Sequence, residues 1–381
     1  MTRINGRWLE NPATQRVMTL LTDAGYQAYF VGGCVRNALL KTAISDVDIA
    51  TDAHPDRVIE LSDHAGLKAI PTGVEHGTVT VMSAGILHEI TTYRKDIATD
   101  GRRAVVAFSG NITDDARRRD FTMNALYADA AGQVVDPLGG MDDLENGRVR
   151  FIENADTRIK EDYLRSLRFF RFCAWYGDPQ AGLDPDALAG ISANLEGLEA
   201  LSKERVGAEF KKLLAAPNPA PAVAAMDNTG VLTRLLPGAT SQYLAPLIHL
   251  EADDPNDPIR RLAALGGTGV QNGLRLSRAD NKRLSVLREI LATDMHGMAA
   301  GYRFGARAAI DGELLFSAML GQQPPNGFRE RAEKGNAQIF PICADDLMPE
   351  LQGKALGLRL KELELRWIAS DFSLTKTQLL T

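Results

Sequence analysis

The stretch YFVGGCVRNALLKTAISDVDIAT, residues 29–51, decides the fold of the first part of the chain. An apolar run ends in a glycine pair and a short helical segment follows. SDVDIAT then alternates with the period of two that is typical of a half-buried strand. Residues i and i+2 of a strand point to the same face, so Asp46 and Asp48 direct two carboxylates at one point. Such charges repel each other unless a cation lies between them.

The two aspartates are therefore candidate metal ligands. Mg²⁺ prefers oxygen ligands and is commonly held by one or two carboxylates together with substrate phosphates. The alternative for a bare DxD is a pair of loop aspartates that cap the next helix. Glu89, in the run HEITTY, supplies a third carboxylate on another predicted strand, unless it is an edge-strand residue that faces water. In a two-metal site such carboxylates hold the ions that stabilise the attacking and leaving oxygens.

The residues before the aspartates favour a phosphate site. Gly32 and Gly33 stand at a predicted strand-to-helix turn, where backbone N–H groups can approach phosphates closely. Arg36 follows on the first helical turn. A lone glycine pair is more often only a tight turn. The glycines, the arginine and the DxD together predict a site for a metal ion and a triphosphate.

The chain changes character near Phe151. Before it, helical patterns at 14–25 and 55–66 alternate with strand patterns, and residues 76–93 predict a hairpin that turns near Ala84. After it, Leu, Ala, Arg and Glu recur at helical spacing, as in residues 160–177. We therefore predict an α/β head with a mixed β-sheet, followed by an all-helical remainder.

Composition excludes some classes of protein. With 381 residues we expect two or more domains, and the net charge of −6 is not that of a uniformly basic nucleic-acid binder. Arginines nevertheless cluster locally in the first half. No apolar run approaches the roughly 20 residues that span a bilayer, and the start resembles no export signal. The three cysteines form no CxxC pair, so we expect neither disulfides nor structural zinc and place the protein in the cytoplasm.

Two further motifs carry charged groups at helical spacing. RRRDFTMNAL places Arg119 and Asp120 before a predicted helix, where Arg119 suits a phosphate and Asn124 could reach a ribose hydroxyl. EDYLRSLRFFRF spaces four residues along one helical face: Asp162, Arg165, Arg168 and Arg171. Read alone, the first motif is equally a solvated basic helix start. The second is equally an exposed helix with i, i+3 ion pairs.

The motifs together resemble a known family. GGCVRNALL, SDVDIAT, DIATDGRRAVVAF, RRRDFTMNALY, DPLGGMDDL and EDYLRSLRFFRF occur in the order seen in class II tRNA nucleotidyltransferases and bacterial poly(A) polymerases, of the polymerase β superfamily. Residues 340–368 are similar to the tail segment of that family. The resemblance implies a seahorse-like molecule with a nucleotidyltransferase head (1–150), a helical neck with the nucleotide-selecting helix (151–215), a helical body (216–300) and a helical, tRNA-binding tail (301–381).

The resemblance also implies an activity. Members add CCA to tRNA 3′ ends from CTP and ATP without a nucleic-acid template. It makes Asp46 and Asp48 the metal ligands and places Gly33 and Arg36 at the triphosphate. It makes Asp162 and Arg165 the pair that binds the Watson–Crick edge of the incoming base. A carboxylate can accept from the amino group of cytosine or adenine, and a guanidinium can donate to either ring nitrogen, so one pair can serve both bases.

The resemblance covers a loop as well. Residues 96–103 look like the family's flexible loop, whose pattern is carried by Asp96, Gly101, Arg102 and Arg103. Members restricted to CC addition lack it, so its presence predicts a switch from C to A. The alternative is an ordinary polar hairpin tip. The chain departs from the family pattern where Asn37 replaces Asp, Lys41 replaces Gly and Ala104 replaces Pro.

Taken together, these features predict a Mg²⁺-dependent CCA tRNA nucleotidyltransferase. We expect a monomer that binds CTP, ATP and the acceptor and T arms of tRNA and has no membrane partner. A poly(A) polymerase with the same head and neck is the nearest alternative, since the motifs separate the two poorly. An inactive RNA-binding module is a more distant one, against which the intact Asp46, Asp48, Asp162 and Arg165 speak.

Overall fold

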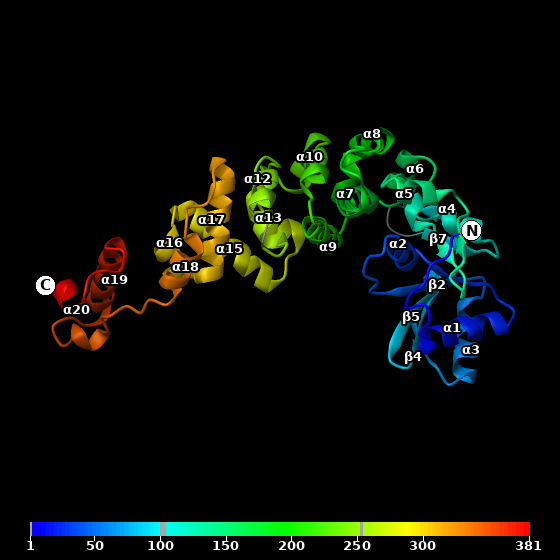
Figure 1. The fold of residues 1–381 in the computed structure, drawn as a ribbon, viewed down its shortest axis with the longest axis horizontal. Coiled ribbons are helices and arrows are strands. Elements are labelled where there is room, and N and C mark those ends of the chain that lie inside the picture. Colours follow the sequence, from blue (N-terminus) through cyan, green and yellow to red (C-terminus); the bar gives the residue numbers. More distant parts are fainter. Residues whose placement is uncertain (1, 100–103, 252–253) are drawn as a thin grey trace. The chain divides into compact units, whose positions relative to one another are not determined.

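The computed structural model describes residues 2–99, 104–251 and 254–381. The chain divides into two compact units, Met1–Leu235 and Leu236–Thr381. The first contains every strand that the structure describes, and the second is built from helices (Figure 1). The predicted α/β head with a helical remainder is therefore confirmed. Within the described ranges, no helix is long and apolar enough to cross a membrane.

A seven-stranded mixed sheet forms the centre of the first unit, in the order β3-β4-β5-β2-β1-β8-β9. Its strands are β1 (Ala28–Val31), β2 (Val47–Thr51), β3 (Lys68–Gly73), β4 (Thr78–Ser83), β5 (Ile86–Thr92), β8 (Tyr127–Ala128) and β9 (Val134–Val135). β2 and β5 run parallel, and their register places Asp48 opposite Glu89. The predicted hairpin is β4 and β5, which turn at Ala84 and Gly85, both with positive φ.

Three helices of the first unit match the sequence patterns. α1 (Pro12–Asp23) and α3 (Pro55–His64) pack together against the sheet, whereas α2 (Gly33–Leu39) begins at the glycine turn after β1 (Figure 1). Pro55 at the first position of α3 suits a helix start, because the missing N–H would have no partner there. The start of α2 holds the glycine turn at the end of β1, and α2 also contacts β2, the strand that contains Asp48.

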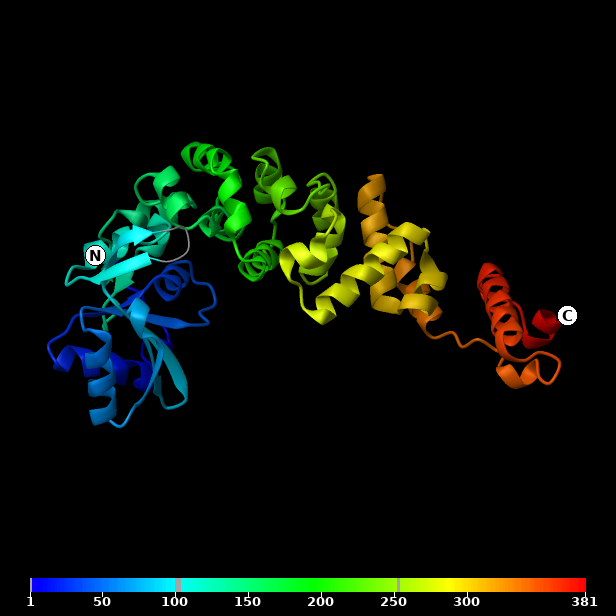
Figure 2. The same cartoon turned by 180° about the vertical axis from the view of Figure 1, so that it is seen from behind.

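The remaining elements of the first unit follow in chain order. They are η1 (Val74–His76), β6 (Arg94–Thr99), β7 (Ala104–Phe108), α4 (Ile112–Arg117), η2 (Thr122–Asn124), α5 (Gly140–Glu145), α6 (Ala155–Glu161), α7 (Leu164–Tyr176), α8 (Pro185–Ala193), η3 (Leu195–Ala200), α9 (Lys203–Leu214), α10 (Ala220–Asn228) and α11 (Val231–Leu235). β6 and β7 form a separate antiparallel hairpin, drawn in cyan in Figure 2.

Aromatic packing joins α7 to the head. The ring of Phe121 lies 4.9 Å from that of Phe151 and 4.8 Å from that of Phe172, measured between centroids. Phe121, Phe151 and Phe169 are almost fully buried. Burying a phenylalanine side chain contributes roughly 1.5–3 kcal/mol, so this cluster fixes α7 firmly against the segment that follows α4.

Three local expectations differ from the structure. The single helix expected over 160–177 is broken, because Asp162 adopts extended backbone (φ −153°, ψ 105°) between α6 and α7. Its carboxylate accepts from the N–H of Leu164 at 3.1 Å, and aspartate favours such capping over a helix interior. The helix expected after Asp120 is the 3₁₀ turn η2, and Asp46 lies one residue before β2.

The second unit consists of helices and one 3₁₀ turn in the part the structure describes. They are α12 (Leu244–Leu250), α13 (Pro258–Leu265), α14 (Val270–Leu274), α15 (Arg278–Thr293), α16 (Gly297–Phe304), α17 (Ala306–Leu320), α18 (Phe328–Asn336), η4 (Ala344–Asp346), α19 (Gly353–Ala369) and α20 (Lys376–Leu380). Trp367 and Leu363 of α19 are buried in an apolar cluster near the end of the chain.

Candidate functional site

A cavity of about 560 Å³ in the first unit gathers most of the predicted site residues. Its lining comprises Gly32, Gly33, Arg36, Asp46, Asp48, Arg118, Arg119, Asp120, Asn124, Asp162, Arg165, Arg168, Arg171, Phe172 and Lys212. The glycine turn lies at the end of the central strand β1, and the aspartates lie at the start of its neighbour β2. The other charged groups come from the η2 region, the α6–α7 junction, α7 and α9. Residues that are far apart in the sequence thus meet in one site.

Asp48 and Glu89 lie on the neighbouring strands β2 and β5, and Asp46 lies one residue before β2. Asp48 is half-buried, and its strand partner Glu89 is exposed and does not line the cavity. Burial, then Glu89 and Asp46, raise the pKa of Asp48 to about 6, although Arg119 opposes the shift. A bound cation would relieve that repulsion, so this oxygen donor set fits Mg²⁺. Within the described residues, no three acidic, histidine or cysteine side chains are already grouped for a metal ion.

The glycine turn leaves room for a ligand beside the aspartates. Gly32 precedes α2 with φ 70°, a conformation that glycine adopts readily. A Cβ atom at this position would also lie 3.5 Å from Nη1 of Arg119. The positive φ therefore favours glycine at this position, whereas a Cβ atom there would make only an ordinary contact with Arg119.

Arg36 is buried, and its donors are used within the protein. Its Nη2 donates to the Tyr176 hydroxyl and to Oδ1 of Asn37, both at 2.9 Å, and its Nη1 donates to Oδ1 of Asn124. The guanidinium also lies 4.1 Å from the centre of the Tyr176 ring. Asn37 in turn donates to the carbonyl of Ala43 at 2.8 Å. Although the family usually has aspartate at position 37, the asparagine still orients Arg36.

Arg119 is fixed by a carboxylate that the sequence reading overlooked. Asp115 on α4 is fully buried and accepts from Arg119 Nη2 at 2.8 Å, from Arg118 Nε at 2.8 Å and from the Tyr127 hydroxyl at 2.7 Å. Burial alone would raise the pKa of Asp115, but the two guanidinium groups lower it to about 2. Asp115 therefore stays ionised and holds Arg119 toward Gly32 and Asp48.

Asp120 and Asn124 are also engaged within the protein. Asp120 accepts from Arg168 Nε at 2.7 Å and from Asn124 Nδ2 at 2.9 Å. Burial opposes ionisation of Asp120, yet Arg168 and these hydrogen bonds lower its pKa to about 2. The main role of the Asp120 carboxylate in this structure is thus to hold the guanidinium of Arg168 in place. The predicted contact of Asn124 with a ribose hydroxyl remains a prediction.

The α6–α7 region brings the predicted base-binding pair to the cavity, but the two do not pair with each other. Asp162 accepts from Arg205 Nη2 at 2.6 Å. Arg165 donates to Glu161 and, at 3.0 Å, to the carbonyls of Arg158 and Arg118. The alternative reading of this motif, an exposed helix with i, i+3 ion pairs, does not hold, because Asp162, Arg165, Arg168 and Arg171 pair with other residues.

Arg171 is the last of the four charged residues of this motif, and its Nε donates to Glu209 of α9 at 2.5 Å. Of the predicted loop residues, Asp96 belongs to strand β6. Gly101, Arg102 and Arg103 lie outside the described residues.

Comparison with known proteins places this site in a family. Residues 28–150 match the model of the poly(A) polymerase head domain, and residues 182–243 match the model described as a probable RNA and SrmB-binding site of polymerase A. The mitochondrial CCA tRNA nucleotidyltransferase 1 of Mus musculus is 30% identical over 400 residues, which cover 98% of this chain and 92% of the mouse protein. The chain belongs to the class II CCA-adding enzyme and poly(A) polymerase family. Enzymes of this family use divalent metal ions.

Bacterial members of the family match over shorter stretches. The CCA-adding enzyme of Oceanobacillus iheyensis is 44% identical over 199 residues, which cover 52% of this chain and 48% of that protein. That of Geobacillus thermodenitrificans is 41% identical over 224 residues, or 58% and 54% of the two chains. The chain thus spans about half the length of these bacterial relatives.

Solved structures of the family share the fold. The Bacillus stearothermophilus CCA-adding enzyme in complex with CTP is similar with a TM-score of 0.73 and 26% identity, covering 94% of this chain and 93% of that one. The Thermotoga maritima CCA-adding enzyme in complex with tRNA has a TM-score of 0.68 at 18% identity, covering 100% and 98% of the two chains, which shows the fold alone.

The site also contains charged residues that hold the predicted site residues in place, and the sequence motifs alone do not assign them this role. Asp115, Glu161, Arg205 and Glu209 each hold one of the predicted residues through an ion pair. Glu161 is the first residue of the motif EDYLRSLRFFRF, and Asp115 lies just before RRRDFTMNAL, so a search for acids near each arginine would have found them. Arg205 and Glu209 come from α9, and no local pattern connects them with α7.

Proposed function

We propose that the protein adds CCA to tRNA 3′ ends, using CTP twice and ATP once without a nucleic-acid template. The observation that carries the proposal is the single cavity that holds the glycine turn, two aspartates and the Asp162–Arg165 region. The printed names of the relatives, CCA-adding enzyme and CCA tRNA nucleotidyltransferase, support it. So does the fold shared with a CCA-adding enzyme in complex with CTP.

In this proposal Asp46 and Asp48 hold Mg²⁺, and Glu89 adds negative charge beside Asp48. When bound, the metal would neutralise the triphosphate and favour the ionised form of the tRNA 3′-hydroxyl that attacks the α-phosphate. Arg119 lies beside both the glycine turn and Asp48, so it would bind the triphosphate at that place. Arg36 would act mainly as a rigid positive charge beside the site, because most of its N–H donors already have partners.

Asp162 and Arg165 would select the base. A carboxylate has about four acceptor positions, and Asp162 uses two of them for Arg205 and the N–H of Leu164. A guanidinium has five N–H donors, and the contacts of Arg165 leave its Nε free among the residues that the structure describes. Both residues can therefore contact a base while their present partners hold them in place. Arg168 and Arg171, fixed by Asp120 and Glu209, would face phosphates or support that pair.

The finer assignments belong to the same proposal. The head spans 1–150, the neck 151–215, the body 216–300 and the tail 301–381, with tRNA bound by the last two. The loop around Asp96, Gly101, Arg102 and Arg103 would support the change from C to A. The protein would act as a monomer in the cytoplasm.

The proposal is tested with a tRNA transcript that ends at the discriminator base. CTP alone, ATP alone or both are supplied with Mg²⁺, and products are sized at single-nucleotide resolution. We expect two additions with CTP and a stop after three with both nucleotides. A long ladder with ATP alone would instead make the protein a poly(A) polymerase. Absence of any addition, with tRNA still bound, would make it an RNA-binding module.

The double change Asp46→Ala, Asp48→Ala tests the metal site. Loss of both carboxylates removes several kcal/mol of charge stabilisation, so we expect the rate of C addition to fall by at least about 10³-fold. The matched control is Asp56→Ala, Asp63→Ala, which removes two exposed aspartates of α3 outside the cavity. Undiminished turnover in the first variant would show that the metal site is assigned to the wrong residues.

A further inference from the structure

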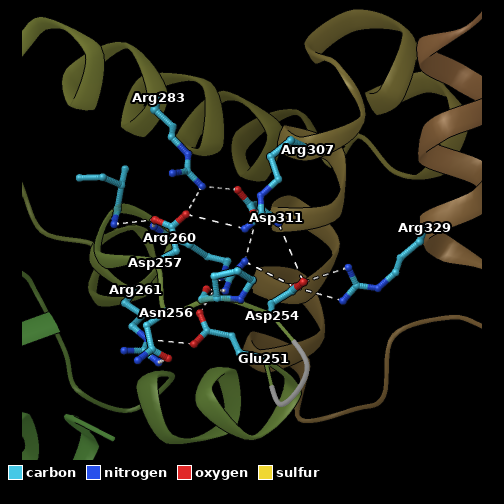
Figure 3. Close-up of polar contacts among 12 residues, drawn as sticks. Glu251, Asp254, Asn256, Asp257, Arg260, Arg261, Arg283, Arg307, Asp311 and Arg329 are labelled. Atoms are coloured by element: carbon cyan, nitrogen blue, oxygen red, sulfur yellow. Dashed lines mark hydrogen bonds and ion pairs between the residues drawn. The ribbon is translucent and has the colours of Figure 1, made fainter. Parts of the chain in front are cut away.

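A network of charged side chains lies inside the second unit, separate from the site described above (Figure 3). It joins α13, α15, α17 and α18 with the segment between α12 and α13. Its inner layer is fully buried, as Arg260 and Asp311 have no exposed surface and Glu251 is 3% exposed. Arg260 donates to Glu251 at 2.6 Å and to Asp311 at 2.8 Å, so the buried charges are paired.

The outer layer consists of three arginines from three helices, here called the arginine triad: Arg283 of α15, Arg307 of α17 and Arg329 of α18. Their side chains are 37%, 49% and 39% exposed. Figure 3 shows all three around the carboxylates of Asp254, Asp257 and Asp311. Those carboxylates are at most 10% exposed, so they hold the arginines from the protein side.

The contacts leave donors available toward solvent. Arg329 binds Asp254 with both terminal nitrogens, at 3.2 and 3.0 Å. Arg283 uses one nitrogen, Nη2, for both Asp257 and Asp311. Arg307 approaches Asp311 to 3.3 Å and Asp257 and Asp254 to 3.8 and 3.9 Å, beyond good hydrogen-bond distance. Its guanidinium is therefore positioned by charge, while its N–H groups remain able to donate.

Arginines are concentrated in this network, since Arg260 and Arg261 of the inner layer lie next to the three arginines of the triad. The chain as a whole is negative, with a net charge of −6, so attraction of a polyanion depends on such local clusters. Planar guanidinium groups that are already oriented lose little further freedom when they bind a phosphate.

We propose that the arginine triad binds a phosphate of the RNA backbone, with Arg307 as the central contact. The inference rests on the proposed function, since it takes tRNA to be the polyanion. It assigns one RNA contact of the second unit to named residues.

The test measures tRNA affinity by filter binding at several salt concentrations, without CTP or ATP. Each phosphate contact adds about one to the slope of log K against log salt. For Arg307→Gln we expect a slope that is smaller by about one and affinity that is about eightfold weaker at 0.1 M salt. Arg307→Lys keeps the charge and should keep the slope. Arg303→Gln of α16 is the matched control, because it removes one exposed arginine outside the network, and it should keep the slope.

Thermal unfolding of each variant separates binding from folding. An unchanged slope in Arg307→Gln would overturn the proposal and leave the network a purely structural one. An equal loss of slope in Arg303→Gln would also overturn it, since total charge rather than a local contact would then be responsible. The proposed function is judged separately, because binding needs no nucleotide. A wild-type protein that binds tRNA through the triad but adds no nucleotide would contradict only the proposed activity.

Discussion

At the scale of single residues, the buried carboxylate of Asp115 has an influence that its position outside the cavity does not suggest. It accepts from Arg118, Arg119 and Tyr127, and none of these contacts reaches a ligand directly. It fixes the arginine that lies beside the glycine turn and Asp48. A displacement of about 1 Å in such a group can lower a rate by as much as 10²-fold.

We therefore expect Asp115→Asn to lower kcat/KM for CTP by about 10–100-fold, because Arg119 loses the charge that fixes it. Breaking a buried ion pair also destabilises by about 3–5 kcal/mol, so turnover is measured well below the melting temperature of the variant. Asp142→Asn, at an exposed position of α5, serves as the control. Activity within twofold of wild type in Asp115→Asn would contradict a positioning role.

Lys41 occupies a backbone conformation that favours glycine. It follows α2 with φ 55°, in the left-handed region that disfavours a residue with a Cβ atom. The family usually has glycine there. We expect Lys41→Gly to raise the free energy of unfolding by about 0.5–1 kcal/mol in urea titrations. Lys41→Ala retains the Cβ atom and should give no such gain, so equal gains in both variants would argue against backbone strain.

At the scale of elements, the sequence predicted which segments form strands or helices better than it predicted which charged side chains pair with one another. The alternation of SDVDIAT and of residues 76–93 predicted β2, β4 and β5, because a sheet with one covered face requires that pattern. The break at Asp162 was missed, because Asp162, Arg165, Arg168 and Arg171 recur at the i, i+3 spacing of one uninterrupted helix. The partners Arg205 and Glu209 were missed as well, since such pairs depend on how α9 packs against α7.

The junction of α15, α16 and α17 contains a pH-dependent contact. His296 lies 3.1 Å from Glu313 of α17 and 3.1 Å from Asp294 at the end of α15, and its ring packs on Phe316. Burial lowers the pKa of His296, but the two carboxylates more than offset this and raise it. The protonated ring is therefore favoured in the folded state.

The sign of the pH effect follows from that shift. Because the folded pKa exceeds the unfolded value of about 6.5, the added stability is complete below about pH 6.5 and is lost as the pH rises through the folded pKa. We expect the difference in melting temperature between wild type and His296→Gln to be largest near pH 6 and to shrink toward pH 9. A difference that stays constant over this range would contradict the ionic contact. His64→Gln on α3, also exposed, controls for loss of a histidine.

At the scale of the whole molecule, the proposed nucleotide site and the proposed RNA phosphate contact belong to different units of the chain. The cavity with all its lining residues lies within Met1–Leu235, and the arginine triad lies within Leu236–Thr381. Each unit buries its own apolar clusters. The sequence predicted the change from mixed to helical structure, but not the unit boundary, which falls at the end of α11, directly before the turn at Pro237 and Gly238.

A chain truncated to residues 1–235 should accordingly unfold cooperatively and bind CTP with a Kd within about threefold of that of the full chain, because no cavity residue is removed. Calorimetric titration and thermal unfolding measure both properties. Its tRNA affinity should fall, since the triad is absent. A truncated chain without a cooperative transition would show that the first unit depends on the second.

The extended backbone at Asp162 has a consequence for redesign. Asp162 is held by Arg205, and Arg165 by Glu161, so neither side chain stands alone on a continuous helix. A substitution at either position would leave a charged residue of another element without its partner. In the proposed base-selecting role of Asp162 and Arg165, a new base preference would therefore require changes at all four positions together.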